Sequence, residues 1–301
     1  MRKLLIICGA TATGKTALAV KLAKALNTEI ISADSQLVYR GLNVGTAKPT
    51  AEEMQGIKHH LIDVVDASES FSVSDYEERA LPIIDGLLNK GKTPIICGGT
   101  GYYINSILYK LGYGNTKADD AVRAKYEKIS DERGKEYLHS LLMEVDEPTA
   151  KKLHCNDVKR VIRALEIYET SGKRKSEQCD EMKPRYDYLA VAVDYPREEL
   201  YERINLRVKK MFDEGLVDEV KRLIDSGIDE NCQCMQAIGY KEVLEGLKNG
   251  DNDSTMRDII AKNTRNYAKR QITFFKKLAN IAWIKPEQAT TQNILKMYCG
   301  E

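Results

Sequence analysis

Close to its N-terminus the sequence reads Gly9-Ala10-Thr11-Ala12-Thr13-Gly14-Lys15-Thr16. The spacing Gly-x-x-x-x-Gly-Lys-Thr is that of a P-loop, whose glycines let several backbone N–H groups face one anion. An apolar run at residues 4–8 precedes the loop and a helical pattern over residues 15–26 follows it. A P-loop requires this strand–loop–helix context. We therefore predict a phosphate site, with Lys15 as a positive charge and the Thr16 hydroxyl as a ligand for Mg²⁺.

Four further apolar runs indicate buried parallel strands, at residues 29–33, 93–97, 189–193 and 281–284. The first three strands of the chain alternate with helical segments, which predicts an α/β fold with a P-loop NTPase-like, doubly wound parallel sheet. Residues 115–187 contain helical patterns only, so we expect an all-helical insertion domain there. The core domain then consists of residues 1–114 and 188–301.

Capping and helix-breaking residues predict where the main helices begin and end. We expect Ser74 to cap a helix that contains Pro82 and reaches Leu88. The other expected boundaries are Asn156 or Asp157 to Gly172, Pro196 to an interruption at Gly215, a second helix ending at Gly227, and a long last helix that starts near Ser254.

The composition is that of a soluble globular protein, with 301 residues, 43% apolar and 30% charged residues, and a net charge of +1. This charge gives no general attraction to nucleic acid, so any basic surface must be local. No signal peptide or membrane span is evident, and seven cysteines without a C-x-x-C pair indicate reduced thiols. We expect a cytoplasmic protein.

The acidic residues argue against a hydrolysing NTPase. Such enzymes place an Asp after a strand next to the P-loop, but here the run at 93–97 continues Gly98-Gly99-Thr100-Gly101. An acid, Asp34, instead follows the run at 29–33. Because strand ends at this edge of an α/β sheet face the ligand, Asp34 is a candidate metal ligand, structural cap or general base.

Basic residues form three groups, each of which also fits a solvated helix face. Arg203 and Arg207 are four residues apart, so both could close over a diphosphate. Residues 151–175 contain eight basic and three acidic residues, a net charge of +5. On the last helix a stripe is spaced as in phosphate-backbone binding, and comprises Lys262, Arg265, Lys269 and Lys276. The adjacent His59 and His60 would point apart, so we expect structural or hydrogen-bonding roles for them.

Taken together, these motifs resemble those of the tRNA dimethylallyltransferase family. They occur in the same order as in that family and cover nearly the whole chain. The segments that carry the resemblance are 9–16, 34–39 (Asp-Ser-Gln-Leu-Val-Tyr), 45–49 (Gly-Thr-Ala-Lys-Pro), 59–63, 98–103, 156–166, 236–242 and 267–271. Eukaryotic relatives add a C-terminal zinc-finger extension that this sequence does not show, so the resemblance is to the compact bacterial form.

The resemblance implies prenyl transfer. The dimethylallyl group of dimethylallyl diphosphate moves, with Mg²⁺, to N6 of adenosine 37 in tRNA. Residues 9–16 and Arg207 would bind the diphosphate, which is the leaving group, with Thr13 at its bridging oxygen. The resemblance gives catalytic roles to Asp34, as general base, and to Thr16 and Arg207.

The resemblance also implies a set of tRNA contacts. The helical insertion would clasp the anticodon stem-loop while the target base turns out of its stack. The positions carried over are Asp34, Ser35, Gln36, Leu37, Thr100, Arg123, Lys159, Arg160, Val161, Ile162, Arg163, Gln236, Ala237, Ile238, Gly239, Tyr240 and Lys241. We expect a monomer.

Three other functions share parts of this pattern. A small-molecule or nucleotide kinase has the P-loop, which alone suggests ATP, and the closing arginines, but no use for a basic helical insertion. Prenyl transfer to free AMP or ADP needs the same core and less of the insertion. A non-catalytic RNA-binding P-loop protein would have no need of Asp34 or of the segments 98–100 and 236–241.

Overall fold

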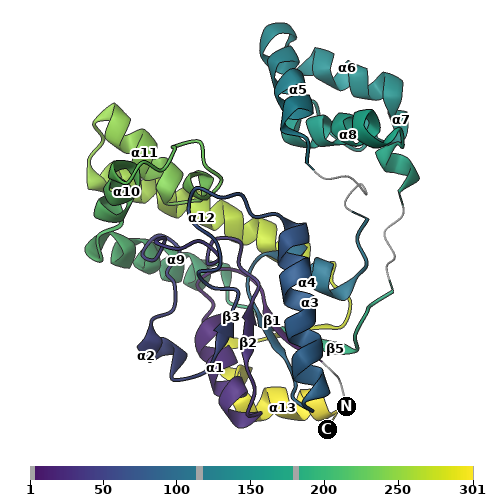
Figure 1. The fold of residues 1–301 in the computed structure, drawn as a ribbon. Helices are drawn as coiled ribbons and strands as arrows, with labels where there is room; N and C mark the ends of the chain where they lie inside the picture. Colours follow the sequence, from purple (N-terminus) through teal and green to yellow (C-terminus); the bar gives the residue numbers. More distant parts are fainter. Residues whose placement is uncertain (1–3, 113–117, 179–182, 301) are drawn as a thin grey trace. The chain divides into compact units, whose positions relative to one another are not determined.

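The computed structural model describes residues 4–112, 118–178 and 183–300 and divides the chain into two compact units. The core unit consists of Met1–Leu108 and Arg185–Glu301, and the helical unit is Tyr109–Pro184 (Figure 1). The boundaries expected from the sequence, 115 and 187, thus lie a few residues later in the chain. Residues 115–117 and 179–182 of the expected insertion fall outside the described residues.

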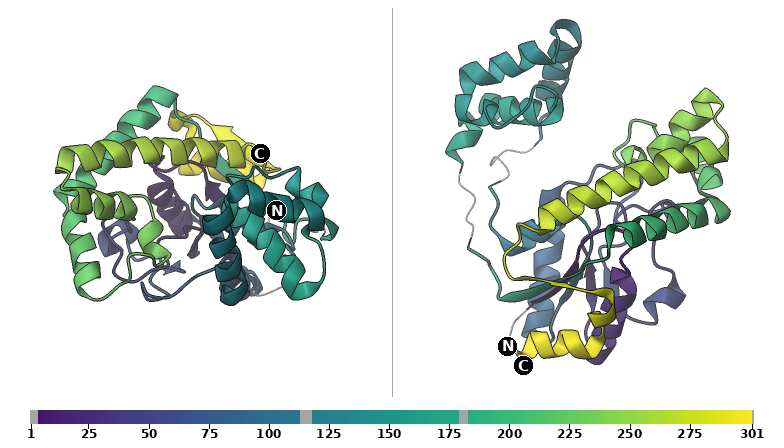
Figure 2. Two further views of the ribbon diagram at one scale, coloured as in Figure 1. Left: turned by 90° about the horizontal axis from the view of Figure 1, so that it is seen from above. Right: turned by 180° about the vertical axis from the view of Figure 1, so that it is seen from behind.

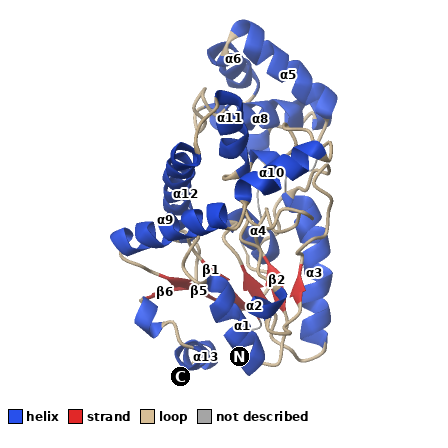
Figure 3. Ribbon diagram, turned by 90° about the vertical axis from the view of Figure 1, so that its left-hand side faces the viewer, coloured by secondary structure: helices blue, strands red, loops and turns tan. Residues whose placement is uncertain are grey.

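The core unit is built on one parallel sheet with the strand order β3-β2-β4-β1-β5-β6. The strands lie together in a layer with helices around it (Figure 3). Five of the strands match the predicted apolar runs. The sixth, β3, was missed because it is a two-residue edge strand made of histidines. The bounds are β1 Leu4–Cys8, β2 Ile30–Ser32, β3 His59–His60, β4 Ile95–Cys97, β5 Tyr188–Val193 and β6 Ile281–Ile284.

Helices cover both faces of this sheet, as predicted for a doubly wound fold. The helices of the core unit are α1 Lys15–Ala25, α2 Ala51–Met54, α3 Val73–Asn89, α4 Gly101–Leu108, α9 Arg197–Asp213, α10 Leu216–Asp225, α11 Tyr240–Asn249, α12 Asp253–Phe275 and α13 Thr291–Cys299, of which α10 and α11 pack on other helices. Two short 3-10 helices are η3 Cys234–Gln236 and η4 Pro286–Gln288.

The direction of the crossovers decides which helix covers which face. The connection from β1 to β2 and the connection from β3 to β4 run in opposite directions across the sheet, so right-handed crossovers place α1 and α3 on opposite faces. Leu5, Ile7 and Val191 pack in one core cluster with Leu22 of α1 and Tyr298 of α13. On the other face α4 contacts α3 and α12, and α12 runs beside α9 (Figure 2).

One helix cap differs from the sequence expectation by two residues. Ser72, and not Ser74, caps α3, because Ser72 and Asp75 form a reciprocal capping box. The last long helix begins near Ser254 as expected: α12 starts at Asp253, and Asn252 caps it by accepting the Thr255 N–H at 3.0 Å. The break at Gly215 separates α9 from α10 as predicted.

The helical unit contains α5 Asp120–Arg133, α6 Lys135–Val145, α7 Glu147–Ala150, α8 Val158–Ser171 and η2 Lys175–Glu177. No strand is present in its described part, in agreement with the all-helical prediction. The helix predicted between Asp157 and Gly172 is α8, with Asp157 at its N-cap and Gly172 at its C-cap. Its own core contains Leu138, Leu142, Val161 and Leu165.

Two chain-wide expectations can be compared with the described residues. Their helices include none that is both long and apolar enough to span a bilayer. Six cysteines are free thiols, while Cys179 lies outside the described residues. Burial raises the pKa of Cys8 and of Cys97 to about 12, so both thiols stay protonated at neutral pH.

Candidate functional site

The P-loop connects β1 to α1 and takes the backbone form that an anion site needs. Gly9 and Gly14 have positive φ angles of 116° and 80°, and the Thr13 hydroxyl donates to the Ala10 carbonyl at 2.9 Å. In the described chain α1 starts after Gly14 without a side-chain cap and without an acidic residue in its first turn. The positive end of the helix dipole is therefore left for a ligand anion.

Lys15 lies in the cavity above this loop, and its ammonium donates to the Ala10 carbonyl at 2.5 Å. Burial lowers the pKa of Lys15, while the nearby Asp34 carboxylate acts in the opposite direction. An anion bound beside the ammonium would offset the unfavourable burial of its charge. Lys15 is thus suited to bind a phosphate group.

Two arginines of α9 line the same cavity, which has a volume of about 800 Å³. Arg203 donates to the Ala12 carbonyl at 2.8 Å and stacks on the ring of Tyr195, with 4.5 Å between guanidinium carbon and ring centroid. Arg207 donates to the Thr46 carbonyl at 3.0 Å. Burial lowers the pKa of Arg207, which stays charged because the pKa of an arginine is so high. The structure therefore brings the predicted pair to the P-loop.

Asp34 follows β2 and lines this cavity together with Lys15, Thr16 and Arg207. One of its carboxylate oxygens accepts the Gln36 N–H at 2.9 Å. Tyr267 of α12 also lines the cavity, and burial together with the Asp34 charge raises the pKa of Tyr267 to about 12. The cavity therefore joins a cationic phosphate-binding side to a carboxylate.

The end of β4 explains why no acid follows that strand. A Cβ at Gly98 would lie 2.1 Å from the Ala33 carbonyl oxygen, so the backbone leaves no room for any side chain there. A Cβ at Gly99 would lie 2.2 Å from the amide nitrogen of Gln271. That amide donates to the Gly99 carbonyl, and its oxygen accepts the Thr11 N–H, both at 2.9 Å. Gln271 thus joins α12 to both loops, a role that was not predicted for it although it belongs to the 267–271 segment.

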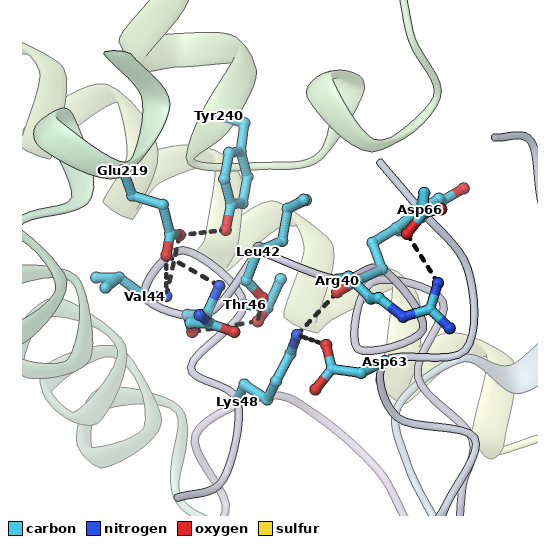
Figure 4. Close-up of polar contacts among 11 residues, drawn as sticks. Arg40, Leu42, Val44, Thr46, Lys48, Asp63, Asp66, Glu219 and Tyr240 are labelled. Atoms are coloured by element: carbon cyan, nitrogen blue, oxygen red, sulfur yellow. Dashed lines mark hydrogen bonds and ion pairs between the residues drawn. The ribbon is translucent and has the colours of Figure 1, made fainter. Parts of the chain in front are cut away.

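The expected RNA contacts of the core unit fall into exposed and buried positions. Ser35, Gln36 and Leu37 are half-buried next to Asp34, and the Ser35 N–H is bound by Thr100 at 3.0 Å. Around η3 and α11, Gln236 and Lys241 are exposed, Ile238 is half-buried, and the buried residues are Ala237, Gly239 and Tyr240. The expected contact of RNA with the Tyr240 side chain is not available here, because its hydroxyl donates to the buried Glu219 at 2.6 Å (Figure 4).

The expected contacts of the helical unit divide in the same way. Lys159 and Arg160 are exposed at the start of α8. Val161 and Ile162 are 0% and 4% exposed, so their side chains belong to the core of the unit and cannot touch RNA in this arrangement. Arg123 and Arg163 both pair with the fully buried Glu166, at 3.0 and 2.7 Å.

Metal binding by protein side chains alone has no support among the described residues, which include no cluster of three or more His, Cys, Asp or Glu. Thr16 of the P-loop and Asp34 are among the side chains with oxygen atoms that line the cavity. His59 and His60 have structural hydrogen bonds, as expected: His59 to the Ile57 carbonyl at 2.9 Å and His60 to Glu29 at 2.6 Å.

A parallel α/β sheet with a P-loop at its carboxyl edge defines a P-loop protein, and two arginines and a carboxylate share the cavity at that loop. Comparison with known proteins gives the family. The family model described as IPP transferase matches residues 37–278. The chain belongs to this family, whose curated relatives are tRNA dimethylallyltransferases.

Several relatives cover almost the entire chain. The tRNA dimethylallyltransferase of Acetivibrio thermocellus is 46% identical over 98% of this chain and 96% of its own length, and that of Bacillus cytotoxicus is 46% identical over 93% and 89%. Among solved structures, the tRNA isopentenylpyrophosphate transferase of Bacillus halodurans has a TM-score of 0.75 at 41% identity, covering 100% of this chain and 96% of that one. A eukaryotic dimethylallyltransferase acting on tRNA has a TM-score of 0.83 at 27% identity, covering 100% and 80%.

Proposed function

We propose that this enzyme transfers the dimethylallyl group of dimethylallyl diphosphate to N6 of adenosine 37 in tRNA and releases diphosphate. The observation that carries the proposal is the shared cavity of Asp34 and the P-loop. A kinase or NTPase would use this loop to hold a nucleoside triphosphate, yet Gly98 leaves no space for the acid that such enzymes place after the neighbouring strand. Family membership supports tRNA as the acceptor.

In this proposal the diphosphate is the leaving group. Its oxygens would accept N–H bonds from the P-loop and lie beside Lys15 and Arg207. As the C–O bond to the allylic carbon breaks, the bonding electrons remain on the diphosphate, and these cations stabilise the growing negative charge. Because the groups are already fixed by hydrogen bonds to Ala10 and Thr46, little reorganisation accompanies the step.

Asp34 would act on the nucleophile. The exocyclic amine of adenine is a weak nucleophile and acquires positive charge as the new C–N bond forms. A carboxylate beside it takes one amine proton, which leaves a neutral secondary amine on the base. The bond from the Gln36 N–H to Asp34 fixes the orientation of the carboxylate in the cavity.

A Mg²⁺ ion fits the donor set of this site. Magnesium in phosphoryl sites is held by one or two protein oxygens together with substrate phosphate and water. The Thr16 hydroxyl, next to Lys15 in the cavity, is the oxygen that we propose for this role. The ion would add positive charge at the leaving diphosphate.

For the tRNA, we propose that the exposed Lys159 and Arg160 contact phosphates of the anticodon stem-loop. Ser35, Gln36, Leu37 and Thr100 would surround the turned-out adenosine near Asp34. We further propose that the enzyme acts as a monomer in the cytoplasm.

The test uses labelled dimethylallyl diphosphate with three acceptors: tRNA, free AMP and ATP. We expect label in tRNA alone, and none in a tRNA with guanosine at position 37. Label in AMP would favour the free-nucleotide reaction. ATP turnover with a phosphorylated small molecule as product would instead support a kinase and contradict the proposal.

A further inference from the structure

One wall of the cavity is a loop whose backbone is bound by a buried glutamate. The consecutive N–H groups of Asn43, Val44 and Gly45 all donate to the Glu219 carboxylate of α10, at 2.9–3.1 Å. The Tyr240 hydroxyl at the start of α11 donates to the same carboxylate at 2.6 Å (Figure 4). Four donors from two distant parts of the chain thus converge on one side chain that is 3% exposed.

Consecutive N–H groups that face one point form a typical anion-binding nest. In this nest the bound anion is the Glu219 carboxylate of the protein itself. The N–H groups of residues 43–45 are therefore not free to bind a phosphate group. Burial, together with the Glu219 charge, raises the pKa of Tyr240 far above its usual value, so the hydroxyl remains a donor. The nest therefore works as a fixed joint between the loop, α10 and α11.

Close packing and three further contacts fix the same loop. A Cβ at Gly45 would lie 2.5 Å from the Tyr240 ring, so only glycine allows this approach. The Thr46 hydroxyl donates to the Leu42 carbonyl at 2.8 Å. Lys48 donates to the Tyr39 carbonyl at 2.8 Å and pairs with Asp63. The position of the Thr46 carbonyl is consequently determined by residues behind the loop.

That carbonyl is the hydrogen-bond acceptor for Arg207, at 3.0 Å. We propose that Glu219 is a positioning residue for the diphosphate site: through residues 43–46 it holds Arg207 in place, with Tyr240 as its partner. The inference rests on the proposed function of Arg207 in binding diphosphate. It also gives Tyr240, a residue of the 236–241 segment, a role without direct RNA contact.

The first test measures binding of inorganic pyrophosphate by calorimetry to Glu219→Gln. The amide keeps the shape of the side chain but replaces one acceptor oxygen by a donor, so the loop loses part of its anchor. We expect affinity to fall about ten-fold, as the loss of bonds to a charged acceptor suggests. Asp218→Asn is the matched control, because Asp218 is an exposed acid in the same first turn of α10.

A double-mutant cycle distinguishes positioning from a general loss of structure. If Glu219 acts through Arg207, Glu219→Gln should have little further effect on pyrophosphate affinity in an Arg207→Gln background. Tyr240→Phe removes one donor from the joint, and we expect a smaller loss that is also absent in that background. This variant provides the test if Glu219→Gln does not fold.

Unchanged pyrophosphate affinity in a folded Glu219→Gln protein, or effects that simply add to those of Arg207→Gln, would overturn the inference. Pyrophosphate binding does not depend on the identity of the acceptor. If wild-type protein binds pyrophosphate but labels no tRNA, the proposed function fails while the role of Glu219 can still be decided.

Discussion

Asp34 is the residue whose replacement should separate chemistry from binding. Its carboxylate faces the cavity that also contains Lys15 and Arg207, with one oxygen bound by the Gln36 N–H. Asp34→Asn keeps the size of the side chain but removes the proton acceptor. We expect kcat for prenyl transfer to fall at least ~100-fold, the usual contribution of a general base. The dissociation constant for tRNA, measured by filter binding, should change little.

Asp66→Asn serves as the control for the change in charge, since Asp66 is an exposed residue that pairs with Arg40. Wild-type turnover by the Asp34→Asn enzyme would exclude Asp34 as the base. A large loss of tRNA affinity with unchanged kcat would assign it to RNA binding alone.

Gly98 shows how closely the backbone constrains the end of β4. Gly98→Ala would bring a methyl group to 2.1 Å from the Ala33 carbonyl oxygen, a backbone atom that cannot rotate away. We expect the free energy of unfolding in urea to fall by at least about 2 kcal/mol, as for overpacked cores. Gly86→Ala on α3 is the control, because its Cβ would meet nothing within 4 Å and alanine favours a helix. Equal stability of the two variants would contradict the steric explanation.

The residues that the sequence predictions missed are polar residues on buried helix faces. Glu219 lies on the same face of α10 as Leu216, Val220 and Leu223, a spacing that marks a buried position. Its neighbours Asp218, Lys221 and Arg222 are charged, so the local sequence also fits a solvated acid. Its partners, the N–H groups of 43–45, are far away in the sequence, and local patterns contain no information on such pairs. The role of Gln271 of α12 was missed for the same reason.

At the level of elements, long apolar patterns were predicted well and short polar elements were not. The runs that became β1, β2, β4, β5 and β6 could be recognised because parallel strands are buried on both faces. The strand β3 has no such run, since its place at the sheet edge leaves His59 and His60 half-buried. For α3, two serines were available as caps, and only the reciprocal bond of Ser72 with Asp75 selects the first.

The start of α8 should supply electrostatic affinity for tRNA. Lys159 and Arg160 are exposed, whereas Arg163 is half-buried and paired with Glu166. We expect the Lys159→Ala/Arg160→Ala variant to bind tRNA more weakly. The negative slope of log affinity against log salt concentration should become shallower by about two. Lys128→Ala on α5 is the control, since Lys128 pairs with Glu132 in the same unit. An unchanged slope would show that α8 does not contact the phosphates.

Glu166 should stabilise the helical unit in a pH-dependent way. Burial raises the pKa of Glu166, but hydrogen bonds from the Asp119 N–H and Arg163, with the Arg123 charge, lower it by more, so its folded-state pKa is below normal. A depressed pKa means stability that is present above the unfolded value of about 4.3 and is lost as pH falls through the folded pKa.

Glu166→Gln should therefore reduce protection of α8 amides from hydrogen exchange at pH 7 by about 2 kcal/mol. The difference from wild type should shrink as the pH falls below the unfolded-state pKa. Glu132→Gln, an exposed acid on α5, should show no such pH-dependent difference. A Glu166→Gln effect of constant size from pH 7 to 3 would contradict the explanation.

For the whole molecule, the sequence could predict the class of fold but not the order of the strands. Buried apolar runs resemble one another, so nothing in them specifies that β4 lies between β2 and β1. This order brings the ends of β2 and β4 together, and the Ala33 N–H donates to the Cys97 carbonyl at 2.8 Å. Asp34 and the P-loop therefore lie on either side of the end of β4, and both line the cavity together with Gly98 and Gly99. A candidate site could be predicted residue by residue, but its assembly depends on the topology.

The helical unit is inserted at a single point of the core unit. The Arg185 N–H donates to the Leu108 carbonyl at 2.7 Å, so the chain leaves the core and returns to it at adjacent residues. Because the ends are already together, replacing residues 109–184 by a short Gly/Ser linker should cost little loop-closure entropy. The P-loop, Asp34, Arg207 and Glu219 all belong to the part that remains.

We expect this shortened protein to fold with a cooperative transition and to bind inorganic pyrophosphate within about three-fold of wild type, because none of the groups in the cavity has been removed. Its tRNA affinity, in contrast, should fall at least ~100-fold, since the phosphate contacts at α8 are gone. Fluorescence of Trp283 in β6 can monitor folding, and calorimetry and filter binding can measure the two affinities. Retained tRNA affinity would place the RNA-binding surface on the core unit. Loss of pyrophosphate binding in a folded protein would instead show that the helical unit contributes to the diphosphate site.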